Sequence, residues 1–204
     1  MPIITDLRAA PRLNQVYSRM GFKPAKADIP ESMLAMVDEA IQLGKALAEP
    51  KACYQYFPIM RTEPNMIEIE GQFVIQSAKV YDWMAGCQGL YIGAVTLGPE
   101  LDQTVAEMMA DNYVTKGFLV NAYGAQAAEA AMVELNHIIT QETETNGFAT
   151  SKRYSPGYGD WAISAQKDVL QAINAAQIGI SLTDNYLMIP EKSVSAIIGM
   201  RPQR

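Results

Sequence analysis

The chain has 204 residues, 49% of them hydrophobic, and its 16 basic and 22 acidic side chains give a formal net charge of −6. Nucleic-acid binding needs a basic face that neutralises phosphates, so this composition argues against such a partner. No apolar run approaches the ~20 residues that span a bilayer, and the first residues lack the apolar stretch of a signal peptide, which favours a cytoplasmic protein without membrane contact. Two cysteines and one histidine are too few for a disulfide framework or a zinc site, so we expect no resident metal.

The first 60 residues are predicted to form a helical lead to a core that spans residues 61–204, within one compact unit. Residues 12–21 have the pattern of a short helix. After Pro30, apolar residues recur at helical spacing and predict a second helix that Pro50 ends; they are Met33, Met36, Val37, Ile41 and Leu43.

Alternating apolar and polar residues then predict three strands, at residues 53–60, 66–71 and 72–78. Glu70 and Gly71 are typical turn residues between the second and third of these strands. We therefore expect a tight hairpin at this point of the chain, and its two strands should run antiparallel.

A short helix is predicted at residues 77–87, and a nearly uninterrupted apolar run follows at residues 90–98. Such a run, bounded by glycines, is typical of a central strand that is covered on both faces. The residues that we expect to be largely buried in this strand are Tyr91, Ile92, Ala94 and Val95.

Helical periodicity extends from Pro99, which suits the first turn of a helix, to Gln141. The pattern fits one very long helix or two helices, with a bend near Lys116 and Gly117. Small residues dominate the middle of this stretch, which favours close packing against a neighbouring helix or sheet.

The last third of the chain begins with a polar, glycine-rich and aromatic connection at residues 142–161, of the kind that often forms a binding loop. A short amphipathic helix is predicted at residues 162–174, a strand pair or a strand and turn at residues 178–190, and a final strand at residues 193–200. Because helices and strands mix without regular alternation, we predict an α+β fold in which long helices flank a twisted, mainly antiparallel sheet.

None of the usual catalytic side chains stands in a recognised pattern, so no residue is predicted to be catalytic. His137 lies in a helical run without a suitable Ser, Cys or Asp neighbour, which favours a packing or surface role. Cys53 and Cys87 lack cationic neighbours and are expected in the core. Gly93 and Gly98 bracket a strand that leads into a helix, where an anion could bind, but strand and capping roles are favoured because the phosphate-loop signatures are incomplete.

The strongest local signal is RYSPGYGDW, residues 153–161. Arg153 offers a fork for a carboxylate, Pro156 stiffens the turn, and the two glycines allow close approach of a ligand to the backbone. The aromatic faces that could contact a flat ring are those of Tyr154, Tyr158 and Trp161. The segment fits a loop that binds a zwitterionic, flat-ringed small molecule, and equally an ordinary turn held by aromatic side chains.

Four segments, in the same order, resemble the activation (reactivation) domain of cobalamin-dependent methionine synthase. RYSPGYG matches the R-x-x-P-G-Y signature of that family. LYIGAVTLGPELD, the DNY at residues 111–113 and LTDNYLMIPEKSVSAIIG are similar to three further segments of the family pattern. The resemblance covers about residues 90–200 and implies the fold of that domain.

The resemblance also implies that the domain binds S-adenosylmethionine in a shallow groove and covers a corrinoid while its oxidised cobalt is reduced and remethylated. By position, Arg153 would hold the methionine carboxylate, the backbone at Ser155 would contact the ligand, and Tyr158 would lie near the corrinoid. With Pro156 and Gly157, these residues form the predicted cofactor-binding site. The implied partners are a separate corrinoid-binding methyltransferase, on which cobalamin is contacted, and a flavodoxin-like reductant.

The sequence also departs from the family pattern. Gly147 replaces an acidic residue six positions before the motif arginine, so the ammonium group of the ligand loses its partner unless Glu142 or Glu144 shifts into place. Asp160 and Trp161 place a carboxylate and a large ring next to the motif, and the sequence ends before a further strand of the family.

Two functions therefore stay open. The first is an accessory protein that supports reductive methylation of a corrinoid on a separate methyltransferase. The second is a non-catalytic binding or scaffold protein that keeps the fold but has lost the S-adenosylmethionine site. A third, an independent small-molecule methyltransferase, has less support because no general base stands near the motif.

Overall fold

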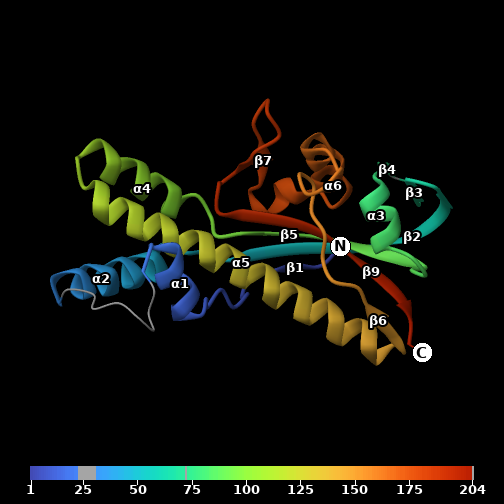
Figure 1. The fold of residues 1–204 in the computed structure, drawn as a ribbon, viewed down its shortest axis with the longest axis horizontal. Coiled ribbons are helices and arrows are strands. Elements are labelled where there is room, and N and C mark those ends of the chain that lie inside the picture. The colour runs from blue at the N-terminus through green and yellow to red at the C-terminus, as the bar shows by residue number, and fades with distance from the viewer. Residues whose placement is uncertain (23–30, 72, 204) are drawn as a thin grey trace.

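The computed structural model describes residues 1–22, 31–71 and 73–203, which form an antiparallel sheet with helices on both faces (Figure 1). The strands of the main sheet follow the order β4-β3-β2-β5-β9-β6, and β1 pairs with β2. These strands are β1 (Ile3–Ile4), β2 (Lys51–Glu63), β3 (Met66–Ile69), β4 (Val74–Gln76), β5 (Gly89–Thr96), β6 (Phe148–Thr150) and β9 (Ser193–Pro202). Every pairing of named strands in the described ranges is antiparallel, which confirms the predicted α+β class.

Strand β5 is the centre of the sheet, as its apolar sequence predicts. It pairs along its whole length with β2 on one side and with β9 on the other, and all eight of its residues are buried. Tyr91 is 7% exposed, and Ile92, Ala94 and Val95 are 0% exposed, which confirms the predicted core of this strand.

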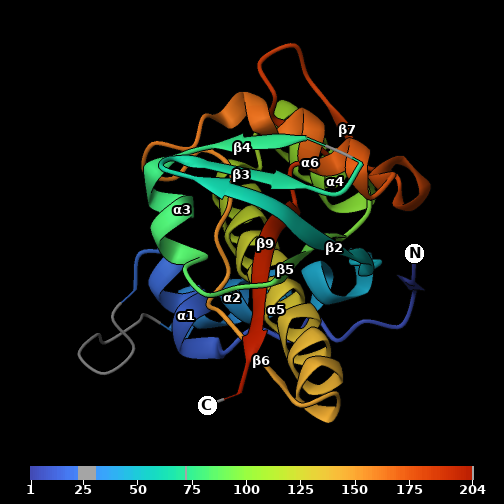
Figure 2. The same cartoon turned by 90° about the vertical axis from the view of Figure 1, so that its right-hand side faces the viewer.

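Two layers cover the sheet (Figures 1 and 2). One layer contains α1 (Leu13–Arg19), α2 (Glu31–Leu47) and α5 (Val114–Thr145) and shares a core with Tyr54, Tyr91 and Ile198. The other contains α3 (Ala78–Trp83), α6 (Gln166–Ala172) and the β3–β4 hairpin and shares a core with Ile92 and Ile197. The N-terminal helices thus pack on one side of the sheet.

The helical stretch after Pro99 consists of two helices, α4 (Glu100–Ala110) and α5. The break lies at residues 111–113, where Asn112 has a φ of 64°, and the bend predicted near Lys116 and Gly117 is therefore misplaced. Asparagine is one of the few residue types that adopt this left-handed conformation routinely. Gly117 instead lies in the first turn of α5, where its N–H donates to the carbonyl of Tyr113 at 2.9 Å.

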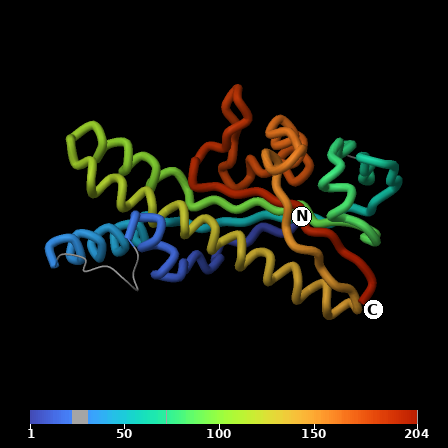
Figure 3. The backbone as a smooth tube through the Cα atoms, viewed as in Figure 1, coloured from blue at the N-terminus to red at the C-terminus, as the bar shows by residue number. Residues whose placement is uncertain are grey.

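Small residues in α5 allow the close packing that their sequence predicts. A Cβ atom at Gly124 would lie 2.6 Å from Cδ2 of Leu101, so glycine lets α4 approach α5. Helix α4 and the start of α5 lie at one end of the elongated molecule, together with α2, and α5 then runs along the molecule. The β3–β4 hairpin lies at the other end (Figure 3).

Several predicted boundaries shift in the structure. Helix α5 continues to Thr145 and β6 pairs with β9, so the polar connection is residues 151–162 instead of 142–161. The predicted strand pair is present as β7 (Ser181–Leu182) and β8 (Met188–Ile189), and the predicted helix before it as a 3-10 turn (Ile163–Ala165) and α6, followed by a second 3-10 helix (Ala175–Ile178).

The proposed division at residue 60 falls inside β2, which pairs with β5 before this point and with β3 beyond it. The division into a lead and a core stays a prediction. In the structure the second predicted helix begins at Glu31. Pro30, which precedes this helix, and Gln72, the first residue of the third predicted strand, lie outside the described residues.

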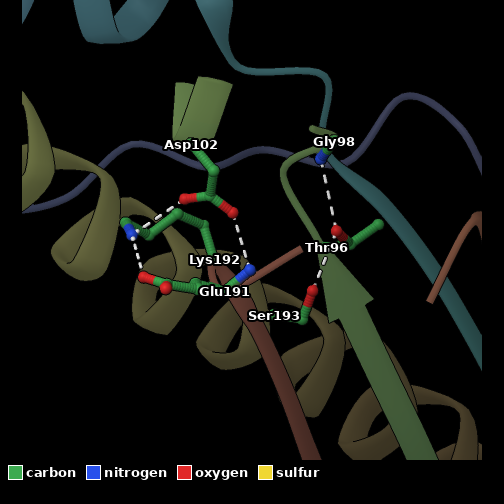
Figure 4. Close-up of polar contacts among 6 residues, drawn as sticks. All are labelled: Thr96, Gly98, Asp102, Glu191, Lys192 and Ser193. Carbon is green, nitrogen blue, oxygen red and sulfur yellow. Dashed lines mark hydrogen bonds and ion pairs between the residues drawn. The ribbon is translucent and has the colours of Figure 1, made fainter. Parts of the chain in front are cut away.

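A buried ion pair fixes the start of β9 to α4 (Figure 4). Lys192, whose side chain is 6% exposed, places its Nζ 2.9 Å from Oδ1 of Asp102, and Oδ2 of the same carboxylate accepts the backbone N–H of Glu191 at 2.6 Å. Next along the chain, the hydroxyl of Ser193 lies 2.9 Å from that of Thr96. These contacts place the first residues of β9 beside the site described below. The carboxylate of Asp102, in the first turn of α4, is occupied by the backbone N–H of Glu191 and by Lys192.

Candidate binding groove

The motif loop, residues 151–162, is tied to β9 through Tyr154. Its N–H donates to the carbonyl of Ile197 at 3.0 Å, and the N–H of Ile197 donates back at 2.8 Å. The ring of Tyr154 stacks on Trp161 with centroids 6.4 Å apart and lies 5.5 Å from Trp83. The interpretation of the segment as a turn held by aromatic side chains is therefore confirmed.

Both glycines of the loop serve this turn. Gly157 has a φ of 88°, and its N–H donates to the carbonyl of Trp161 at 2.8 Å. Gly159 has a φ of 58°, and a Cβ atom there would lie 2.4 Å from the hydroxyl of Tyr154. Glycine adopts these conformations without a steric cost. The resulting turn leaves the side chain of Tyr158 66% exposed at its tip.

The same loop also forms one wall of a groove with a volume of about 430 Å³. Of the five predicted site residues, the structure brings four into this wall, whereas Gly157 only shapes the turn. The groove is lined by Glu129, Arg153, Tyr154, Ser155, Pro156, Tyr158, Ile163, Gln166, Met188, Ser193, Val194 and Ser195. The loop is thus both an aromatic turn and part of a concave site.

Arg153 faces a carboxylate across the groove. Its Nη2 donates to Oε2 of Glu129 on α5 at 2.6 Å, and the two side chains are 31% and 48% exposed. Its Nη1 is buried and has no hydrogen-bond partner among the described residues. Side by side, the two charges can bind a zwitterion.

Sequence reasoning missed Glu129, which lies 24 positions before Arg153 on a different element. The signal that could have found it is a lone acidic residue within the small-residue stretch of α5. Small neighbours leave room for another chain segment to pack closely. A charged side chain among them is then partly removed from water, which favours pairing with a group of opposite charge.

Polar contacts hold the floor of the groove. The hydroxyl of Ser155 donates to the carbonyl of Ser195 at 2.7 Å, and Nε2 of the buried Gln166 donates to the hydroxyl of Ser195 at 2.5 Å. Loop, α6 and β9 therefore meet at one residue. Pro156 is buried beside this point and restricts the loop further.

Asp160 and Trp161, which were expected next to the site, do not line the groove. The carboxylate of Asp160 accepts hydrogen bonds from the hydroxyl of Ser77 and from the N–H of Ala78 at the start of α3. These bonds, the one from Ser77 foremost, lower the pKa of Asp160. Trp161 is buried in the core. Both departures from the family pattern therefore serve the fold.

Neither Glu142 nor Glu144 lines the groove, so neither takes the place of the acidic residue that Gly147 replaces. Glu142 accepts a hydrogen bond from the hydroxyl of Tyr54 at 2.8 Å and lines a different pocket, and Glu144 is exposed near the end of α5. Gly147 forms the turn between α5 and β6, also outside the groove. Glu129 is the carboxylate that lies beside Arg153.

The other candidate residues have no chemical partner in the groove. His137 is exposed on α5. Burial raises the pKa of the Cys53 thiol to about 12. Burial also raises the pKa of the Cys87 thiol, although the charge of Arg201 acts in the opposite direction. Neither thiol is therefore activated as a nucleophile. In the described ranges no three His, Cys, Asp or Glu side chains gather as metal ligands, and no helix there combines the length and the hydropathy that crossing a bilayer requires.

A family model described as the activation domain of vitamin B12 dependent methionine synthase matches residues 73–204, which include the whole groove. The chain belongs to this family. The match extends the sequence resemblance, which covered about residues 90–200, toward the N-terminus. A search of curated proteins found no match.

A solved structure supports the same fold for the whole chain. The crystal structure of the MetH reactivation domain bound to AdoHcy is similar over 100% of this chain and 79% of that one, with a TM-score of 0.75 and 14% sequence identity. At this identity the likeness shows the fold alone. It includes the N-terminal helices, for which the sequence offered no resemblance.

Proposed function

We propose that this activation-domain protein binds S-adenosylmethionine in the groove and supports reductive methylation of a corrinoid held by a separate methyltransferase. The observation that carries the proposal is the pair of Arg153 and Glu129, with Nη1 of the arginine buried and without an acceptor. Family membership supports it, and so does the fold neighbour, whose ligand AdoHcy is what remains of S-adenosylmethionine after methyl transfer.

In this proposal the two charged side chains bind the amino-acid end of the ligand. Arg153 donates to its carboxylate, for which the planar guanidinium fork is suited, and Glu129 accepts from its ammonium group. The backbone at Ser155 adds polar contacts, and Pro156 and Gly157 fix the loop that carries them. When bound, the ligand supplies the methyl group that is transferred to the reduced corrinoid.

The rim of the groove offers an apolar surface to the partner. Tyr158 is 66% exposed at the tip of the loop, and Ile163, which also lines the groove, is 42% exposed. An exposed apolar patch beside a binding site is typical of an interaction surface. We assign to it contact with cobalamin on the methyltransferase, with a flavodoxin-like protein as the electron donor in the cytoplasm.

One observation favours the alternative, a scaffold that keeps the fold without binding the ligand. Arg153 and Glu129 already neutralise each other at 2.6 Å, so a ligand must replace this contact with better ones. The affinity of the groove for a zwitterion therefore separates the two functions.

Calorimetric titration of the full chain with S-adenosylmethionine and AdoHcy tests the proposal. We expect a dissociation constant on the order of tens of micromolar, equivalent to about 6 kcal/mol of binding free energy. Arg153→Ala and Glu129→Gln should each weaken binding by more than about tenfold. Arg61→Ala removes an exposed ion pair with Glu63 outside the groove and is the matched control. Absence of binding up to millimolar ligand would support the scaffold.

A further inference from the structure

A second pocket, of about 440 Å³, lies between β2, β5 and the end of α5 and shares no residue with the groove. Four of its eleven lining residues are aromatic, namely Tyr54, Tyr56, Tyr91 and Phe148. Tyr54 and Tyr91 are 7% exposed, whereas Tyr56 and Phe148 are partly exposed. The nearly buried rings therefore form the floor and the others the rim.

Three tyrosine rings line the pocket and are tilted relative to one another. Tyr56 and Tyr91 are direct partners in the pairing of β2 with β5, and their centroids lie 5.3 Å apart with a tilt of 60°. Tyr54 and Tyr91 are 6.3 Å apart with a tilt of 47°. The three rings therefore form one aromatic cluster at the pocket.

Glu142 brings a negative charge to the pocket. Among the described residues it is the only charged side chain in the lining, which contains no lysine or arginine. The hydroxyl of Tyr54 donates to Oε2 of Glu142 at 2.8 Å. Burial, and then the bond to Glu142, raises the pKa of Tyr54 to about 12, so the phenol keeps its proton and holds the carboxylate at neutral pH. The α-amino group of Met1 also borders the pocket but forms no ion pair with Glu142 within the described ranges.

We propose that this tyrosine pocket binds a small organic cation with an alkylated ammonium head, such as a quaternary ammonium group. The faces of aromatic rings attract cations, and they favour those that are weakly hydrated. A carboxylate at the edge adds attraction for the charge. Hard metal ions need several oxygen ligands, which the rings do not supply, and a neutral apolar ligand would gain nothing from Glu142.

Nuclear magnetic resonance titration of the full chain with choline and with 3,3-dimethyl-1-butanol, its neutral isostere, tests the proposal. We expect choline to shift the amide signals of β2, β5 and the last turns of α5 in a saturable manner, with at least about tenfold higher affinity than the alcohol. Equal affinities would show that charge is irrelevant and overturn the proposal. Shifts confined to the groove would overturn it as well.

Variants locate the site. Tyr56→Leu should weaken choline binding about tenfold, while Tyr56→Phe, which keeps the ring face, should retain it. Tyr113→Leu removes a tyrosine that is 65% exposed and far from the pocket in the chain, and it should change nothing. If Tyr56→Leu does not fold, the exposed Glu142→Gln decides: a loss of about threefold or more supports the site, and wild-type affinity contradicts it.

Discussion

Strand β5 and the motif loop are held in place by different forces. All eight residues of β5 are buried, and strands pair with it on both sides along its whole length. The loop has an isolated β-bridge to β9 at Tyr154 and hydrogen bonds from Ser151 and Ser155 to the same strand. It also has ring contacts with two tryptophans and two glycines in left-handed conformations. Stability should therefore depend on the strand and ligand binding on the loop, and substitutions should separate the two.

The largest effect is expected in β5. Ile92→Ala should lower the free energy of unfolding by about 2–5 kcal/mol, because it removes buried methyl groups and leaves a cavity. Urea titration measures this loss, and the folded variant should bind S-adenosylmethionine as the wild type does. A loss below about 0.5 kcal/mol would contradict the central position of β5.

Lys192 tests the connection between the two regions, because it fixes the strand that borders the groove. Lys192→Ala should cost about 2–3 kcal/mol, since Asp102 would lose the partner of a mostly buried ion pair but keep some solvent contact. Lys116→Ala, which removes an exposed pair with Glu39, is the control and should cost about 0–1 kcal/mol. Equal losses in urea titration would show that burial adds nothing at Lys192.

In the loop, the expected change is in affinity. Arg153→Ala and Arg153→Lys should both weaken S-adenosylmethionine binding by more than about tenfold, because lysine keeps the charge but not the planar fork. The free energy of unfolding should fall by less than about 1 kcal/mol, since the pair with Glu129 is partly exposed. A lowered Tm with unchanged affinity would mean that Arg153 only braces the turn.

The smallest effect concerns Asp160 and pH. Its lowered pKa means that the charged carboxylate stabilises the fold above the usual Asp pKa of about 3.9, and this contribution is lost as the pH falls through the folded-state pKa. The difference in Tm between wild type and Asp160→Asn should therefore be present at neutral pH and shrink as the pH falls below the usual Asp pKa of about 3.9. A constant difference over this range would show that charge plays no part.

The strands and turns that depend on residues adjacent in the chain were predicted from the sequence. The apolar run of β5, the hairpin turn at Glu70 and Gly71, and the turn around Gly157 and Gly159 follow from local composition, and the structure contains all of them. The break between α4 and α5 was misplaced because the left-handed residue there is Asn112.

Tertiary proximity was the part that the sequence could not supply. Glu129 pairs with Arg153 from the middle of a helix, and no spacing rule connects the two positions. Asp160 and Trp161 adjoin the motif in the chain but point to α3 and to the core. Asp160 and Trp161 were expected at the site because they are close to the motif in the sequence. Glu129 was missed because it is far from the motif in the sequence.

The crystal structure of the chain with AdoHcy tests the central claim most directly. The proposed function predicts the carboxylate of the ligand within hydrogen-bond distance of the Arg153 guanidinium and its ammonium group beside Glu129, with the ion pair between these side chains opened. Crystals grown at saturating AdoHcy in which the groove keeps the closed pair and holds no ligand would contradict the claim.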